Sequence, residues 1–209
     1  MSLILHVDSQ YASPYAMSAF IALTEKRLPF SLQTVDLGAG RQALTDYAAI
    51  SLTRRVPTLE HDDFALSESS AIAEYLDEAF PAGRIYPADR QQRARARQLQ
   101  AWLRSDLFAL REERNTLVVF YRPVAAPLSV RAQQDAAKLC AVAKSLLAED
   151  AANLFGEWCL ADVELALMLN RLRLNGDALP APLAAYAERQ WQRPSVRQWL
   201  DLRRPALPA

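Results

Sequence analysis

The sequence has few of the residues that disulfide frameworks and metal sites require. It contains two cysteines, Cys140 and Cys159, which form no CxxC pair and lie in apolar helical patterns. We interpret both as reduced, inert core thiols, as expected for a cytoplasmic protein. His6 and His61 are far from each other and from the cysteines in the sequence, so no metal site is predicted.

The chain also lacks an excess of charge of either sign and a long apolar segment. Its 24 Lys and Arg residues equal its 24 Asp and Glu residues, so no overall field favours nucleic acid or an anionic membrane. The uncharged stretch Ser9–Thr24 is too short and too polar to span a bilayer, and no basic segment precedes it. We expect an unprocessed protein whose partner is a small molecule, with no nucleic acid and no membrane.

The first part of the chain alternates short apolar runs with helical patterns. Leu3–Leu5 predicts a buried strand, a helix begins at Ser13–Pro14, and Phe30–Asp36 predicts a second, parallel strand. Residues 37–53 read as a loop that holds a short irregular helix, and we expect this loop to be mobile. These patterns predict a β-α-β unit at the N-terminus.

The stretch that follows predicts a hairpin leading directly into a helix. Thr58–Glu60 and Phe64–Leu66 are two apolar runs separated by a short polar turn. Ser67 is the expected N-cap of a helix that runs to Phe80, and Glu68 places negative charge in its first turn. The resulting order, β-α-β-α-β-β-α, is that of a thioredoxin-like domain.

Two features of this region are suited to holding a ligand. A helix N-terminus offers unpaired N–H groups and a partial positive charge, so an anionic group could rest at Ser69. An X-Pro bond such as Val56-Pro57 adopts the cis form at low cost, and a cis turn could present the Val56 backbone to a peptide-like ligand as an added strand. The pattern therefore predicts a small-molecule site.

The second half of the chain has a different pattern. Residues 81–87 are rich in proline, and beyond Asp89 strand-like alternation is limited to the brief run Val118–Phe120. We therefore expect an α/β domain over residues 1–82 and an all-helical domain over residues 89–209. Expected helices cover residues 89–117, 129–150, 160–174, 180–189 and 194–202.

Several conspicuous residues of the helical half are best explained by folding. The helix from Leu160 is apolar all round and should be the buried axis of its domain. Trp191 and Trp199 are expected to be packing anchors. The basic run Arg93–Arg97 lacks interleaved aromatic residues, so we interpret it as a solvated or dimer-facing helix surface.

The motif R-V-P-x-L at Arg55–Leu59, the hairpin, and E-S-x-A-I-x-x-Y-L at Glu68–Leu76 together resemble a known family. They are similar to the glutathione-site half of the thioredoxin-fold glutathione S-transferases, and the chain looks closest to the bacterial YfcF-type branch. The resemblance runs over nearly the whole chain. It implies glutathione as co-substrate, no metal, a homodimer, and a role in detoxification or oxidative stress in the cytoplasm.

Glutathione chemistry requires an ionised thiol, whose ordinary pKa is about 8.5. A hydroxyl that donates to the thiolate at a helix N-terminus could lower this pKa by roughly one to two units. Ser13, just before Pro14, combines both features, with Tyr11 and Ser9 as alternatives. Ser13-Pro14-Tyr15-Ala16 also looks like the Cys-Pro-Tyr-Cys of glutaredoxins with both thiols removed, which excludes a dithiol mechanism.

The resemblance implies a role for each residue that matches the family motif. Val56, with Pro57, would pair with the cysteinyl backbone of glutathione. Ser69 would hold the γ-glutamyl carboxylate, and Glu68 would hold the amine. Arg55 stands where the family often has Lys or Gln for the glycyl carboxylate, and Arg54 replaces a common Gly. In the family, the buried helix starts with a hydroxyl N-cap three residues before an Asp. Here Cys159 stands at that cap, and we interpret Asp162 as structural.

These roles predict an enzyme that binds glutathione, stabilises its thiolate, and transfers it to an electrophile or reduces an organic hydroperoxide. Tyr11, the first helix and the faces of the helices after Asp89 would contact the acceptor substrate. Two alternatives remain open. One is a glutathione-dependent isomerase or dehalogenase, and the other is a binding or scaffold protein of the same fold without turnover.

Overall fold

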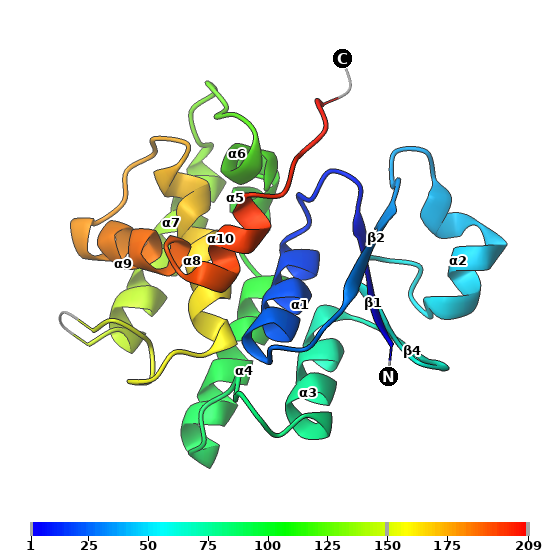
Figure 1. Ribbon diagram of the computed structural model, residues 1–209. Coiled ribbons are helices and arrows are strands. Elements are labelled where there is room, and N and C mark those ends of the chain that lie inside the picture. Colours follow the sequence, from blue (N-terminus) through cyan, green and yellow to red (C-terminus); the bar gives the residue numbers. More distant parts are fainter. Residues whose placement is uncertain (1, 149–150, 208–209) are drawn as a thin grey trace. The chain divides into compact units, whose positions relative to one another are not determined.

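The chain folds into two compact units. The structure, a computed structural model, describes residues 2–148 and 151–207. One unit comprises Met1–Ile85 with Gln198–Ala209, and the other comprises Tyr86–Arg197 (Figure 1). The sequence-based division counts residues from 198 onwards in the second domain, whereas they group with the first unit. The reason is Trp199, whose ring packs against those of Tyr11 and Phe20 with centroids 5.8 and 5.2 Å apart.

The first unit is built on a four-stranded sheet with the strand order β2-β1-β3-β4. β1 (Leu3–Asp8) pairs in parallel with β2 (Ser31–Val35) and antiparallel with β3 (Thr58–His61). β3 pairs antiparallel with β4 (Phe64–Ser67), which confirms the predicted hairpin.

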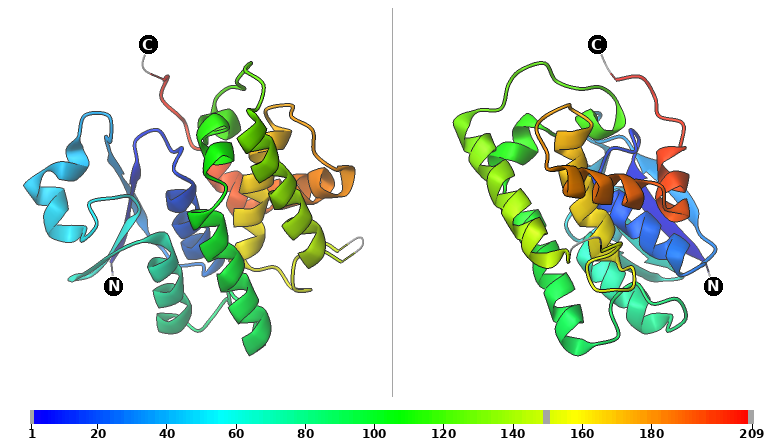
Figure 2. Two further views of the ribbon diagram at one scale, coloured as in Figure 1. Left: turned by 180° about the vertical axis from the view of Figure 1, so that it is seen from behind. Right: turned by 90° about the vertical axis from the view of Figure 1, so that its left-hand side faces the viewer.

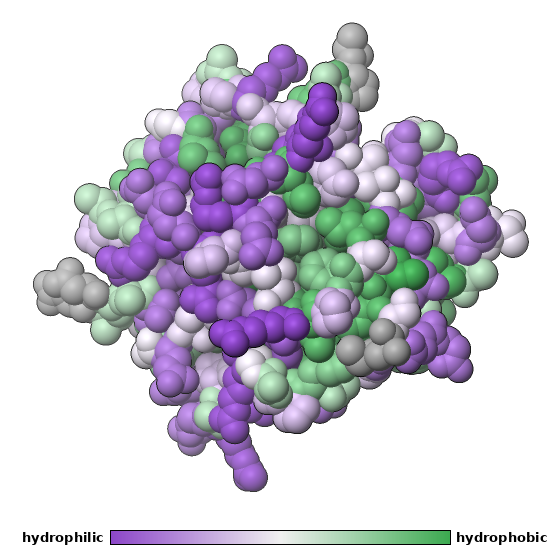
Figure 3. Space-filling view, viewed as in Figure 1, coloured by the Kyte–Doolittle hydropathy of each residue, from purple (hydrophilic) through white to green (hydrophobic). Residues whose placement is uncertain are grey.

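Helices cover both faces of this sheet. α1 (Pro14–Glu25) and α3 (Ser69–Ala79) lie on one face, and α2 (Thr45–Ile50) lies on the other (Figures 1 and 2). The turn η1 (Arg41–Ala43) precedes α2. The element order is the thioredoxin-like order predicted from the sequence. On the face shown in Figure 3, hydrophobic residues gather over α1 and the strands beside it.

The second unit is a bundle of helices. Its elements are α4 (Arg90–Ser105), α5 (Phe108–Glu113), α6 (Leu117–Phe120), α7 (Val130–Leu146), α8 (Leu160–Arg173) and α9 (Ala181–Trp191), followed by α10 (Pro194–Leu200), which leads into the first unit. α4 and α7 run side by side (Figure 2), and α8 contacts both α4 and α9. Among the described residues, no helix is both long and apolar enough to cross a membrane.

The expected single helix over residues 89–117 is interrupted, and that prediction is wrong. Leu107 adopts a left-handed conformation with φ of 60° between α4 and α5. The Asp106 carboxylate accepts hydrogen bonds from the Leu107 N–H at 2.7 Å and from the Trp102 indole N–H at 2.8 Å, which offers the backbone an alternative to the helical bond. The apolar run Val118–Phe120 is a helical turn, α6, and not a strand.

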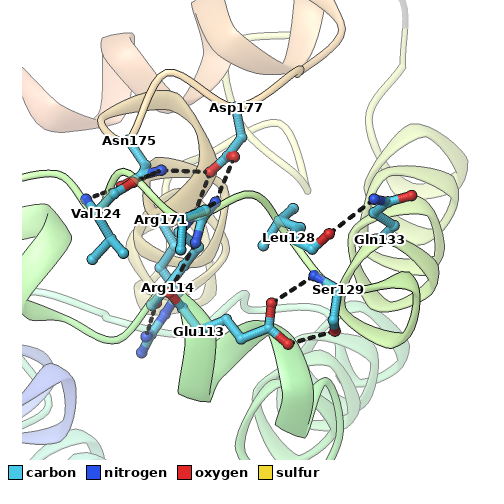
Figure 4. A network of polar contacts seen from close by, with 10 residues as sticks. Glu113, Arg114, Val124, Leu128, Ser129, Gln133, Arg171, Asn175 and Asp177 are labelled. Carbon is cyan, nitrogen blue, oxygen red and sulfur yellow. Dashed lines mark hydrogen bonds and ion pairs between the residues drawn. The ribbon is translucent and has the colours of Figure 1, made fainter.

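A polar network ties α5 to α7 and α8 in the second unit (Figure 4). The guanidinium of Arg114, which is 2% exposed, donates to both carboxylate oxygens of Asp177 at 2.6 and 2.9 Å. Arg171 of α8 donates to the Arg114 carbonyl at 2.7 Å. Glu113 accepts from the backbone N–H and the hydroxyl of Ser129, the N-cap of α7. These bonds pair the buried Arg114 guanidinium with Asp177 and link the ends of α5 and α8 to the start of α7.

Candidate functional site

Three connections meet at one end of the sheet in the first unit. Asp8 ends β1, and the register pairs Thr58, the first residue of β3, with His6 of β1 and with Ser67, the last residue of β4. The β1–α1 loop, the turn that contains Pro57, and the start of α3 therefore emerge at the same edge. The sequence motifs singled out above are the residues of these three connections.

Ser13 is the N-cap of α1, as predicted. Its Oγ accepts a hydrogen bond from the Ala16 N–H at 3.2 Å, and Pro14 occupies the first helical turn. The cap bond uses a lone pair of the hydroxyl oxygen and leaves its hydrogen available, so Ser13 can cap the helix and also donate a hydrogen bond to a ligand. The side chain is half-buried at the helix N-terminus, where the helix dipole favours negative charge.

The loop that carries Ser13 is held by Asp8, a residue that the sequence analysis did not single out. Its carboxylate, in a residue that is 5% exposed, accepts the backbone N–H groups of Ala12 at 2.7 Å and of Ser13 at 3.0 Å. The Asp8 carbonyl also accepts the Tyr11 N–H at 3.0 Å. The sequence could have indicated this turn, because an aspartate at the end of a strand often accepts hydrogen bonds from backbone N–H groups a few residues further on.

The turn before β3 rests on a cluster of buried hydroxyl groups. The Val56-Pro57 peptide bond is cis, and both residues are buried. The carbonyl of Arg55 accepts from the hydroxyls of Tyr47, Ser51 and Thr58 at 2.8, 3.2 and 3.1 Å. Burial raises the pKa of Tyr47, so its hydroxyl stays protonated and donates. The cluster fixes the peptide that leads into Val56.

The start of α3 differs from the predicted one. Ser67 is not the N-cap, because it remains in β4 through its pairing with Thr58. Glu68 occupies the N-cap position with φ of 76° and no side-chain capping bond, and the helix begins at Ser69. Glu68 is exposed and Ser69 is 4% exposed. The Ser67 hydroxyl accepts the Thr53 N–H at 3.4 Å, which links this helix start to the turn before Pro57.

The two arginines of the motif lie on the outer side of that turn. Arg54 and Arg55 are both exposed, and Arg54 adopts a left-handed backbone with φ of 52°. This conformation explains why a glycine suits the position of Arg54. Both guanidinium groups are free to reach toward an anionic ligand group from solvent, and their roles stay a prediction.

A pocket of about 630 Å³ opens on the α2 face of the same sheet. Polar side chains of the strands form its floor, where His6 Nε2 lies 2.5 Å from Glu60 Oε1, and Tyr47 and Arg41 contribute to its walls. Three described residues were predicted as candidates to activate the thiol. Ser9 lines this pocket, and Ser13 and Tyr11 do not. The structure thereby separates Ser9 from the other two.

The two cysteines are buried or half-buried, and His61 contacts an aromatic side chain of α3. Burial raises the pKa of the Cys140 and Cys159 thiols, so both are protonated at neutral pH. His61 Nδ1 lies 2.6 Å from the Tyr75 hydroxyl on the hairpin side of α3. Within residues 2–148 and 151–207, no group of three or more His, Cys, Asp or Glu side chains has the arrangement of a metal site.

The sheet with its helices defines a thioredoxin-like domain, and a helical domain follows it. Family models described as "Glutathione S-transferase, N-terminal domain" and "Glutathione S-transferase, C-terminal domain" match residues 9–84 and 89–204. The chain therefore belongs to the glutathione S-transferase family. Its place in the YfcF-type branch stays a prediction.

Individual relatives agree with this assignment. A glutathione transferase homolog from Burkholderia, solved with bound glutathione, is 47% identical with a TM-score of 0.78, over 96% of both chains. Glutathione S-transferase theta-3 of Mus musculus is 36% identical over 49% of this chain and 42% of its own length. Maleylacetoacetate isomerase of Dictyostelium discoideum is 30% identical over 47% of this chain and 46% of its own length. The chain thus spans less than half the length of the Mus and Dictyostelium relatives.

Proposed function

We propose that this protein is a glutathione transferase that binds glutathione at the sheet edge defined by Ser13, the cis Val56-Pro57 turn and the start of α3. The observation that carries this proposal is the meeting of a hydroxyl-capped helix N-terminus, a cis-proline turn and a second helix N-terminus at one edge. The Burkholderia relative, which is similar over 96% of both chains, was solved with bound glutathione, and this supports the proposal.

In this proposal each part of glutathione has a named partner. The Val56 backbone pairs with the cysteinyl backbone beside Pro57, and the Ser69 hydroxyl, together with the N–H groups at the start of α3, holds the γ-glutamyl carboxylate. Glu68 takes the amine, for which its exposed carboxylate is chemically suited. Arg55 reaches the glycyl carboxylate. Of these partners, the start of α3 has the firmest physical basis, because helical N–H groups and the dipole both favour an anion.

Ser13 would then activate the sulfur. Its hydroxyl donates to the thiolate, which attacks an electrophilic carbon whose leaving group departs with the bonding pair. With an organic hydroperoxide, the thiolate attacks one peroxide oxygen and the O–O bond breaks, which leaves a sulfenic acid on glutathione and an alkoxide that takes a proton from water to become the alcohol. The thiol of a second glutathione then attacks the sulfenic sulfur, forming the disulfide and releasing water. We propose that Tyr11 contacts the acceptor substrate.

Two further points belong to the same proposal. We propose a cytoplasmic homodimer that acts in detoxification or in the response to oxidative stress, which suits its two free thiols. Glutathione-dependent isomerisation is the second candidate activity, and the similarity to the Dictyostelium isomerase favours it. Conjugation and isomerisation share the same activated thiolate, so they are separated by testing the acceptors.

Glutathione will raise the melting temperature of the protein. A ligand present at about 100 times its dissociation constant adds about 2.7 kcal/mol to the free energy of unfolding, which is several degrees for a chain of this size. Differential scanning fluorimetry with millimolar glutathione measures the shift, with a peptide of the same charge that lacks the γ-linkage as control. No shift with glutathione or its conjugates would remove the basis of the proposal.

Ser69→Ala and Glu68→Gln will raise the Michaelis constant for glutathione much more than they change turnover. These contacts are made equally in the ground state and the transition state, so their loss weakens binding without slowing chemistry. Ser70→Ala is the matched control, since Ser70 is an exposed serine one residue further along α3. Calorimetry that finds unchanged glutathione affinity in both variants would contradict the placement of the γ-glutamyl group at this helix start.

A further inference from the structure

The loop before Ser13 contains one residue whose backbone is held from both sides. Tyr11 adopts a left-handed conformation with φ of 49°, which non-glycine residues rarely adopt without support. Its N–H donates to the Asp8 carbonyl at 3.0 Å, and its carbonyl accepts from the Arg204 guanidinium at 3.2 Å. The peptide group that follows Tyr11 is therefore fixed by a residue from the far end of the chain.

Arg204 is itself fixed by the segment that carries it. Its Nη1 donates to the carbonyls of Leu200 and Leu202 at 2.8 and 3.2 Å, and its Nη2 donates to the carbonyl of Trp199 at 3.1 Å as well as to Tyr11. The planar guanidinium thus joins three carbonyls of the C-terminal segment to one carbonyl of the loop. A lysine ammonium cannot reproduce this fork, because its three N–H donors all leave one nitrogen and do not lie in a plane.

The Tyr11 side chain is held by the same segment. The Trp199 side chain is 0% exposed, and its ring meets the Tyr11 ring edge-on with centroids 5.8 Å apart. On the other side of the loop, the Asp8 carboxylate holds the N–H groups of Ala12 and Ser13. Arg204 and Asp8 therefore hold the C=O and the N–H of the single peptide group that joins Tyr11 to Ala12, and Asp8 also holds the next N–H, that of Ser13.

We propose that Arg204 is a positioning residue for thiol activation, which acts through the Tyr11 carbonyl to fix the direction of the Ser13 hydroxyl. This inference rests on the proposed function, and it adds the C-terminal segment to the site. Without the Arg204 contact, the Tyr11 peptide can leave the left-handed region and the hydroxyl loses its fixed direction. The partners of the glutathione backbone lie on other connections, so binding should survive.

The test compares Arg204→Ala and Arg204→Lys with Arg203→Ala, an exposed neighbouring arginine as control. We expect Arg204→Ala to lower kcat about tenfold and to raise the pKa of bound glutathione by about one unit, with KM for glutathione within about twofold of wild type. Arg204→Lys should lie between the two, and methylguanidinium at concentrations that leave the protein folded should restore part of the activity of Arg204→Ala. Arg203→Ala should match wild type.

Amide exchange of Ala12 and Ser13, measured without glutathione, tests the contact independently of the reaction. Faster exchange in Arg204→Ala than in Arg203→Ala is expected. Unchanged exchange together with an unchanged thiol pKa would overturn the positioning role. A parallel loss of kcat and of folded protein, with the thiol pKa unmoved and no rescue, would overturn it too, because Arg204 would then serve stability alone. A wild-type protein that fails to ionise bound glutathione would instead overturn the proposed function, whatever the exchange rates.

Discussion

Ser13→Ala will lower turnover near neutral pH roughly ten- to a hundredfold while glutathione binding stays largely intact. A hydrogen bond to a charged group contributes about 1.5 to 3 kcal/mol, and one pKa unit corresponds to about 1.36 kcal/mol, so the bound thiol pKa should rise by one to two units. The Val56 backbone and the start of α3 are untouched by the substitution. The loss should therefore appear in kcat, and the Michaelis constant for glutathione should move little.

The pH dependence identifies the cause of this loss. If Ser13 stabilises the thiolate in the wild-type protein, activity should develop at a lower pH than the ionisation of free glutathione. In Ser13→Ala the thiol ionises only at higher pH, and much of the activity should return there because hydroxide removes the proton without help. Titration of the thiolate absorbance of the bound complex, in wild type and variant, measures the shift directly.

The control must separate this effect from the loss of a helix cap, which alone can cost about 0.5 to 2 kcal/mol. Ser129→Ala is the control, because Ser129 caps α7 through a bond to the Ala132 N–H of 3.2 Å, the length of the Ser13 bond to Ala16. It also removes the donation to Glu113, so its loss of stability sets an upper bound for the loss of a cap. It should lose stability but keep the wild-type thiol pKa. Superimposable titrations of Ser13→Ala and wild type, with full activity, would make Ser13 a cap alone and move the role to Tyr11 or Ser9.

The parts of the site that could be predicted from the sequence are those encoded within a few neighbouring residues. A serine before a proline determines a helix start locally, and Val56-Pro57 allows a cis bond whatever surrounds it. Both appear in the structure at the predicted places. The roles of these residues toward glutathione still require the experiments above.

Two of the contacts that were missed depend on how distant elements pack, unlike the local contact of Asp8 with Ala12 and Ser13. The Arg204 contact with Tyr11 joins positions 193 apart, and nothing near Arg204 in the sequence indicates it. The Tyr47 hydroxyl reaches the Arg55 carbonyl only because α2 folds back against the turn before β3. Such contacts depend on tertiary packing, which a single sequence does not display.

The two local errors have the same origin. Ser67 is chemically a good N-cap, yet the hairpin register keeps it in β4 and moves the helix start to Ser69. The break between α4 and α5 has neither proline nor glycine at Asp106 and Leu107, so composition gave no warning. In both places, hydrogen bonds to partners outside the helix decide where the helix begins or ends.

Asp162→Ala will cause the largest loss of stability among these variants. The residue is 0% exposed at the start of α8. Its carboxylate accepts from the Leu154 N–H at 2.8 Å, the Cys159 N–H at 2.9 Å and the Tyr186 hydroxyl at 2.8 Å. Burial raises the pKa of Tyr186 well above its ordinary value, so that hydroxyl remains a donor. Asp162 therefore joins the loop before α8 to α9.

Removing the carboxylate leaves three donors in the interior without their acceptor. Each buried group that loses its partner costs about 1 to 3 kcal/mol, so we expect a loss of about 3 to 5 kcal/mol in the free energy of unfolding. For a chain of about 200 residues this lowers the melting temperature by about 10 °C or more. Chemical denaturation and thermal melts of the same samples measure both quantities.

Two companion variants make the result specific to the buried carboxylate. Glu157→Ala removes an exposed carboxylate from the same loop and should change stability by less than about 0.5 kcal/mol. Tyr186→Phe removes one of the three donors and should cost about 1 kcal/mol, and less in the Asp162→Ala background because the pair acts together. If Asp162→Ala melts within a degree or two of wild type but loses turnover, the carboxylate is not the structural hub of α8 and a role in catalysis has to be considered for it.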